Sequence, residues 1–176
     1  MSSLRLISQT TVAAGLSNID IAGVFNDDFD VYKIVVTGIV GSANARFDVY
    51  LLDSGGSVIS GDFNNATLEL KGDTGYNEQK YTSLSYWKNM GYAGANGAGG
   101  FVMHLFNPYA SADATHYISE SYGGFTGDGG THDNITNRGQ GVLKDATIVG
   151  GIRIACSNTT AGTLGKVAIY GYGMEA

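Results

Sequence analysis

Three histidines, His104, His116 and His132, carry the side chains best suited to metal binding or acid–base catalysis near neutral pH. They are too far apart in the sequence to match the short ligand spacings of zinc motifs. His104 also lies inside the apolar run from Phe101 to Phe106, where a core or interface histidine is the commoner arrangement. We therefore expect no metal site and no catalytic residue among the three.

Two acidic segments concentrate the oxygen ligands that calcium prefers. They are Asn26-Asp27-Asp28-Phe29-Asp30 and the stretch from Asp128 to Asn134. Neither matches the EF-hand pattern, and Asx-type turns with solvated carboxylates account for both. The sequence therefore predicts neither a bound metal nor a cofactor.

Signals for catalysis are weak. Gly97-Ala98-Gly99-Gly100 looks like a phosphate-binding loop, but the run that follows it predicts a strand, so the helix N-terminus that would hold a phosphate is missing. No Gly-x-Ser-x-Gly nucleophile motif occurs. Paired carboxylates for glycoside cleavage would have to lie about 5–9 Å apart, a distance that only the fold sets. We expect no enzymatic activity and keep a glycoside hydrolase as an alternative.

Aromatic residues cluster in the middle third of the chain and are the stronger candidates for a binding role. Tyrosine and tryptophan combine contact area with a polar group, which suits subunit interfaces and sugar stacking as well as a sandwich core. Trp87, Tyr86 and Tyr92 are a candidate stacking platform for a carbohydrate. The cluster also contains Tyr117, and its candidate binding residues are Tyr76, Tyr81, Tyr86, Trp87, Tyr92, Tyr109 and Tyr122.

The elements that would position these residues are strands. Glycine occurs 27 times against one proline, and it separates short runs rich in β-branched and aromatic residues. Between Arg46 and Asp53, Phe47, Val49 and Leu51 alternate with more polar residues, which is typical of a half-buried strand. The more continuously apolar runs from Tyr32 to Val40 and from Phe101 to Phe106 predict central strands that are covered on both faces.

These and six further runs make about nine strands, which predicts an all-β chain that folds as a single jelly-roll-like antiparallel β-sandwich over residues 1–176. Helix is expected in one or two short turns at most. Asp53 to Ser57 predicts a tight hairpin turn, and Met90 to Gly100 and Gly123 to Gly130 predict long loops. The six further runs are Leu4 to Val12, Ile19 to Phe25, Gln79 to Tyr86, Thr115 to Tyr122, Thr147 to Ala155 and Leu164 to Tyr172.

Composition narrows the choice of partner. Charged residues make up only 15% of the chain against 43% hydrophobic residues, and the formal net charge is -6 with no basic cluster, which argues against nucleic acid as a partner. The N-terminal residues do not form a signal peptide, and no apolar run is long enough to span a membrane. We therefore expect the protein to be synthesised in a cytoplasm. The single cysteine, Cys156, is expected to be a small buried hydrophobic residue.

Two parts of the sequence resemble small structural proteins of tailed bacteriophages, notably those that infect marine bacteria. The first part runs from Val24 to Val36 and continues from Arg46 to Gly56. The second joins Gly-Gly-Ile-Arg-Ile, at Gly150 to Ile154, to a final strand from Gly162 to Gly173. The segment from about Gly61 to Asp145 is largely unmatched.

The resemblance implies a virion component, either a capsid decoration or knob protein or a subunit of a tail or fibre. Its partners would be other virion proteins, and many copies with weak individual contacts would attach firmly together. A homo-oligomer is expected, with the protein made in the host cytoplasm and located in the virion. The alternatives are a carbohydrate- or receptor-binding module of a tail fibre, which would bind a host-surface glycan, and a glycoside hydrolase.

Overall fold

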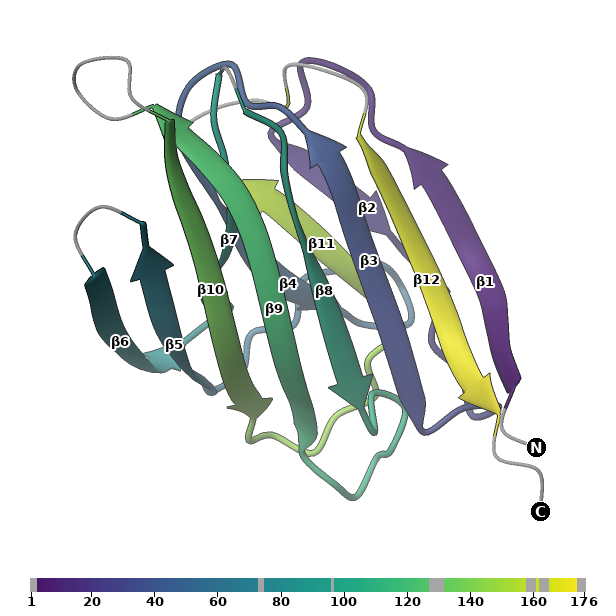
Figure 1. The fold of residues 1–176 in the computed structure, drawn as a ribbon. Helices are drawn as coiled ribbons and strands as arrows, with labels where there is room; N and C mark the ends of the chain where they lie inside the picture. Colours follow the sequence, from purple (N-terminus) through teal and green to yellow (C-terminus); the bar gives the residue numbers. More distant parts are fainter. Residues whose placement is uncertain are drawn as a thin grey trace.

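The computed structural model describes residues 3–72, 75–95, 97–126, 132–157, 161 and 165–173. In this part of the chain, twelve strands form two antiparallel sheets (Figure 1). The larger sheet contains, in spatial order, β1 (Ser3–Thr11), β12 (Lys166–Gly173), β3 (Val31–Ile39), β8 (Gly99–Phe106), β9 (Thr115–Thr126), β10 (His132–Leu143), β5 (Phe63–Lys71) and β6 (Gly75–Leu84). The smaller sheet contains β2 (Asn18–Ile21), β11 (Gly151–Cys156), β4 (Ala45–Leu52) and β7 (Trp87–Ala93).

The smaller sheet lies behind the central strands of the larger one, and the core fills the space between them (Figure 1). On β3, Tyr32, Ile34 and Val36 are buried and alternate with partly exposed residues, because successive side chains of a strand point to opposite faces. Phe47 of β4 meets Phe101 of β8 across this core, with ring centroids 6.0 Å apart. The predicted antiparallel β-sandwich is confirmed.

The strand count is higher than the nine expected, because β5, β7 and β10 were not recognised in the sequence. On β5 the usual pattern is inverted, since Asn65, Thr67 and Glu69 are buried while Ala66 and Leu70 are exposed. In β7 and β10, glycine and asparagine occupy positions where a strand signal needs larger apolar residues. Periodicity therefore gave no signal for β7 and β10, and on β5 the alternation of apolar and polar residues indicated the wrong buried face.

The segment from Met90 to Gly100 is not the long loop that its glycine content predicts. Met90 to Ala93 belongs to β7, and Gly99 and Gly100 begin β8. A Cβ atom on Gly99 would lie 1.6 Å from the Tyr92 carbonyl oxygen, so glycine is required there by close contact between backbones. The prediction for Gly123 to Gly130 was wrong for residues 123–126, which belong to β9, and its remaining residues lie outside the described part of the chain.

The tight turn after β4 is confirmed. The Asp53 N–H donates to the Ser57 carbonyl oxygen at 2.8 Å, and Gly56 has a φ of 83°. The Asp53 carboxylate accepts hydrogen bonds from the Gly55 and Ser57 N–H groups at 2.9 and 2.8 Å. The returning chain makes only a single bridge, between Leu52 and Val58, before it enters the larger sheet as β5.

Candidate binding surface

One face of the larger sheet packs against the smaller sheet, and no described strand covers the other face, which we call the open face. The prediction that β3 and β8 are covered on both faces was therefore wrong, because alternate residues of both strands face outward and are partly exposed. On β3 the residues of the open face are Val31, Lys33 and Val35, which alternate with the buried core residues. Cross-strand pairing places His104 of β8 beside Lys33, and Ile118 of β9 beside His104. The open face can therefore be followed residue by residue across all eight strands.

Apolar side chains occur on every strand of the open face. Three of the most exposed apolar residues on this face are Leu6, Ile118 and Tyr76, whose exposed fractions are 51%, 50% and 72%. The solvated face of an antiparallel sheet normally carries polar residues at such positions, and a contiguous apolar area marks an interaction site. The full set is Leu4 and Leu6 on β1, Tyr170 and Tyr172 on β12, Val31 and Val35 on β3, Val102 and Phe106 on β8, Ile118 and Tyr122 on β9, Val142 on β10, Ala66, Leu68 and Leu70 on β5, and Tyr76 on β6.

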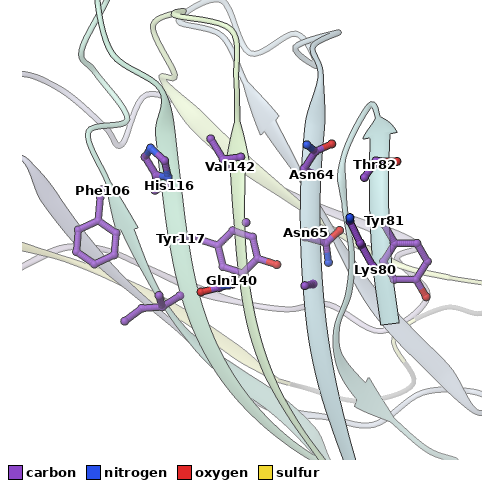
Figure 2. A pocket seen from close by; sticks show the side chains of 13 residues that line it. Asn64, Asn65, Lys80, Tyr81, Thr82, Phe106, His116, Tyr117, Gln140 and Val142 are labelled. Atoms are coloured by element: carbon purple, nitrogen blue, oxygen red, sulfur yellow. The ribbon is translucent and has the colours of Figure 1, made fainter. Parts of the chain in front are cut away.

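The open face is hollowed over β8, β9, β10, β5 and β6. Two adjoining hollows of about 460 and 650 Å³ share Ala66, Lys80, Ile118 and Gln140, which form one cross-strand row from β9 to β6. The short side chain of Ala66 leaves space between the longer side chains of Lys80 and Ile118. A third hollow of about 410 Å³ continues past Ile118 to Val102 and His104 on β8. We call these three hollows the groove, and Figure 2 shows the first of them.

The groove is lined by a balanced set of charges and amides. Arg138 Nε and Glu120 Oε1 lie 3.2 Å apart, with both side chains about 70% exposed, so this ion pair contributes at most about 1 kcal/mol to stability. Glu78 and Lys80 lie two residues apart on β6. Gln140, which supplies an amide, lies on β10 two residues from Arg138. The arrangement suits a neutral partner surface or a polar uncharged ligand, and it does not favour a strongly charged one.

His104 lines the third hollow of the groove, and among the described residues no other histidine lines that hollow. Its Nε2 atom is 3.2 Å from the Tyr172 hydroxyl, and the two rings lie 6.0 Å apart. Burial, and secondarily the charge of Lys33, lower the pKa of His104. The side chain is therefore neutral at pH 7, as expected for an interface or core histidine.

A polar layer connects the two sheets where β7 meets β5 and β10. Glu69 is 2% exposed, and its carboxylate accepts a hydrogen bond from the Tyr92 hydroxyl and lies 3.0 Å from Lys71 Nζ. The Asn137 side-chain amide donates to the Asn89 carbonyl oxygen at 3.0 Å. Buried polar groups of this kind hold β-sheets in a specific register because each must keep its partner.

The bulge in β7 brings a second group of polar residues together. Asn89 has a φ of 60°, and its N–H donates to Asp48 Oδ1 at 3.0 Å. Burial raises the pKa of Asp48, against the opposing effect of that hydrogen bond. The Asn89 side chain also donates to the Tyr81 hydroxyl at 2.7 Å, so Tyr81 has a structural role in this layer.

The predicted binding role was wrong for two residues, because their side chains lie inside the sandwich. Trp87 is fully buried, with its ring 4.4 Å from Tyr117 and 5.5 Å from Phe63. Tyr92 is 1% exposed and points at Glu69. Neither can stack on a sugar, so the predicted platform of Trp87, Tyr86 and Tyr92 does not exist on the surface.

The other predicted binding residues are dispersed. Tyr76 and Tyr122 lie on the open face in one cross-strand row, with Leu70 and Thr136 between them. Tyr86 is partly buried and stacks on Tyr50, with ring centroids 4.7 Å apart, in a different part of the molecule. Tyr109 is a partly buried residue of the turn that follows β8.

The candidate metal and catalytic residues form no centre in the described part of the chain, where no group of three or more His, Cys, Asp or Glu residues could hold a metal ion. Asn26 Oδ1 accepts a hydrogen bond from the Asp28 N–H at 3.2 Å, which is the Asx turn expected there. The side chains of the second acidic segment lie outside the described residues, as does that of His132. His116 is exposed in the groove. Cys156 is buried as expected, and burial raises its pKa to about 11.

The carboxylates that line the groove are Glu78 and Glu120, and Glu120 is paired with Arg138. The two carboxylates stand in one cross-strand row with Arg138 and Leu68 between them, so three strand spacings of about 4.8 Å put roughly 14 Å between their strands. This exceeds the separation of about 5–9 Å that a glycosidase carboxylate pair needs. Regarding membranes, none of the described residues forms a helix with the length and apolar character needed to cross one.

Comparisons with known proteins do not assign the chain to a family. No family model matches the sequence, and no curated protein matches it either. Among solved structures, that of infectious bursal disease virus, Gx strain, aligns at 10% identity with a TM-score of 0.19. The alignment covers 100% of this chain and 41% of the viral chain, so this chain spans less than half the length of that one. A TM-score this low does not establish a shared fold.

Sequence reasoning missed most residues of the groove. Ala66 and Gln140 lie on β5 and β10, two of the strands that were not recognised, and Lys80 lies on a predicted strand in which it was not singled out. Ile118 lies between His116 and Glu120 on one face of a predicted strand, and this exposed isoleucine between polar residues of the same face was the available signal.

Proposed function

We propose that this chain is a bacteriophage virion structural protein, a capsid decoration or knob protein, which attaches to other virion proteins through the open face. The observation that carries this proposal is the presence of apolar side chains on all eight strands of that face. A resemblance to phage structural proteins supports the choice of partner, and it rests on the segments Val24 to Val36, Arg46 to Gly56, Gly150 to Ile154 and Gly162 to Gly173.

The dimensions of the open face suit such an attachment. Eight strands about 4.8 Å apart span roughly 34 Å, and eight residues of strand extend about 27 Å. The resulting area of about 900 Å² is close to the roughly 800 Å² that each partner contributes to a standard protein interface. The charged residues of this face include both signs, with Glu120 paired to Arg138, so a partner of complementary charge can offset the desolvation cost of burying them.

The first test is the abundance of the protein in purified particles of the parent phage, measured by quantitative mass spectrometry. Copies in the hundreds would support decoration of the capsid, and a few to tens would place the protein in a tail, vertex or fibre instead. Complete absence from the particles would contradict the proposal.

A second test addresses the open face itself. Ile118→Lys places a charge at its centre, and we expect the variant to fold normally but to lose co-sedimentation with particles that lack the native protein. Ile148→Lys is the matched control, because Ile148 is a 37% exposed isoleucine outside the strands of the open face. Equal binding by the two variants would show that another surface makes the attachment.

A carbohydrate- or receptor-binding module of a tail fibre is the second candidate, and the groove is the observation that favours it. Its apolar floor at Ile118 and its polar groups at Gln140 and Lys80 match the mixed surface that a neutral sugar needs. A glycan array would show selective binding that Gln140→Ala abolishes and Asp20→Ala, in the smaller sheet, leaves intact. A blank array would remove this candidate.

A further inference from the structure

Strand β6 ends the larger sheet, and in the part of the chain that the structure describes no strand pairs with its outer edge. The strand is ten residues long, where strands average about 5–6 residues. A long unpaired edge presents a row of backbone N–H and C=O groups that can pair with a strand of another chain. The edge therefore needs either protection or a partner.

The side chains of β6 divide between the two faces of the sheet. Glu78 pairs with Leu68 of β5, and Lys80 pairs with Ala66, so both charges point to the open face. Gln79 lies between them and points to the opposite face, where its amide donates to Glu69. An acidic and a basic residue thus stand on either side of a single central residue.

This spacing matters when β6 pairs with β6 of a second copy. Two antiparallel copies related by a two-fold axis through Gln79 place Glu78 opposite the partner subunit's Lys80, and Lys80 opposite the partner subunit's Glu78. Cross-strand pairs of opposite charge stabilise such a ladder, whereas like charges that face each other destabilise it. Shifting the axis by one residue brings either the two Glu78 side chains or the two Lys80 side chains together.

We propose that the chain forms a two-fold symmetric dimer through antiparallel β6–β6 pairing centred on Gln79. The two larger sheets become one continuous sheet, and the two grooves, each lined by Glu78 and Lys80, meet across the axis. Ser83, with a φ of 55°, ends the regular part of the strand. This inference concerns the edge of the sheet and not the open face, so it can fail while the virion proposal stands, and the reverse also holds.

Charge reversal tests the pairing. Sedimentation velocity and light scattering on the full chain over a concentration series should show a dimer for the native protein. Glu78→Lys and Lys80→Glu each replace two attractive pairs with two repulsive ones, and we expect at least a tenfold weaker dimer for each. The double variant E78K/K80E exchanges the charges and should restore the dimer.

Mixing the single variants tests the register. In a heterodimer of Glu78→Lys with Lys80→Glu, every facing pair is again of opposite charge, so native mass spectrometry should show a heterodimer where each variant alone is monomeric. Both variants keep a negative net charge, since each reversal changes the charge by two from -6. General attraction between oppositely charged proteins therefore cannot produce this result.

Asp20→Lys is the control, because Asp20 forms an exposed ion pair with Arg153 on the smaller sheet, with 2.6 Å between Oδ1 and Nε. It should dimerise as the native chain does. Thermal unfolding by circular dichroism establishes that each variant is folded. A monomeric native chain, or single variants that dimerise as tightly as the native chain, would overturn the proposal and leave Glu78 and Lys80 as charges that only protect the edge.

Discussion

The Tyr92 hydroxyl donates a hydrogen bond to the buried carboxylate of Glu69, and this contact joins β7 of the smaller sheet to β5 of the larger one. Tyr92→Phe removes the donor and leaves the carboxylate with less compensation for its burial. We expect the free energy of unfolding to fall by about 2 kcal/mol, the usual cost for a hydrogen bond to a charged group. Urea denaturation of the variant measures this loss, and Tyr122→Phe, on the exposed open face, should change stability by less than about 0.5 kcal/mol. Similar values for the two variants would show that the Tyr92 contact does not stabilise the fold.

The second prediction concerns Trp87, which is fully buried. Its ring packs between Tyr117 and Phe63, so Trp87→Ala should lower the free energy of unfolding by about 3–5 kcal/mol through loss of contacts and creation of a cavity. Because Trp87 is the only tryptophan, the fluorescence of the native protein should be blue-shifted and protected from acrylamide. Oligosaccharides should leave the emission unchanged. Strong quenching in the folded state would contradict the buried position.

The third prediction concerns Gly99 of β8, whose backbone lies close to that of Tyr92 on β7. A Cβ atom there would lie 1.6 Å from the Tyr92 carbonyl oxygen, and neither strand can move away without breaking its pairing. Gly99→Ala should therefore cost about 3 kcal/mol or more in thermal or urea unfolding. In the control Gly55→Ala, the nearest atom is a side-chain oxygen of Asp53 at 3.3 Å, and a loss below about 1 kcal/mol is expected. Equal losses would mean that β7 and β8 are not in such close contact.

The environment of His104 makes stability depend on pH. Burial and Lys33 lower the pKa of His104 in the folded chain, whereas the unfolded chain titrates near about 6.5. Between these two values the unfolded state binds more protons, so stability decreases as the pH falls below about 6.5 and is unaffected by this residue above it. His104→Gln should flatten that part of the stability curve, while the same change at the exposed His116 is the control. A curve unchanged by His104→Gln would contradict the assigned environment.

Alternation and glycine punctuation in the sequence were sufficient to predict the fold class and nine of the strands. The central strands β3 and β8 were recognisable because they are buried on the core side and largely apolar throughout. Cys156 and the turn at Asp53 were also predictable, since each depends on neighbouring residues. Such features are local, and the chemistry of a few adjacent residues determines them.

The binding surface was decided by the tertiary structure. Residues on β5 alternate clearly, but whether Glu69 or Leu68 faces inward depends on what β7 and β10 place beside them. Trp87 and Tyr76 are equally plausible surface aromatics in the sequence, and packing buries the first and exposes the second. The groove likewise requires Ile118 and Gln140 of β9 and β10 to align with Ala66 and Lys80 of β5 and β6, a pair of strands distant from the first pair in the sequence. Composition and local periodicity predict that strands form, but the order and register in which they pair depend on long-range contacts, and those contacts decide which side chains meet.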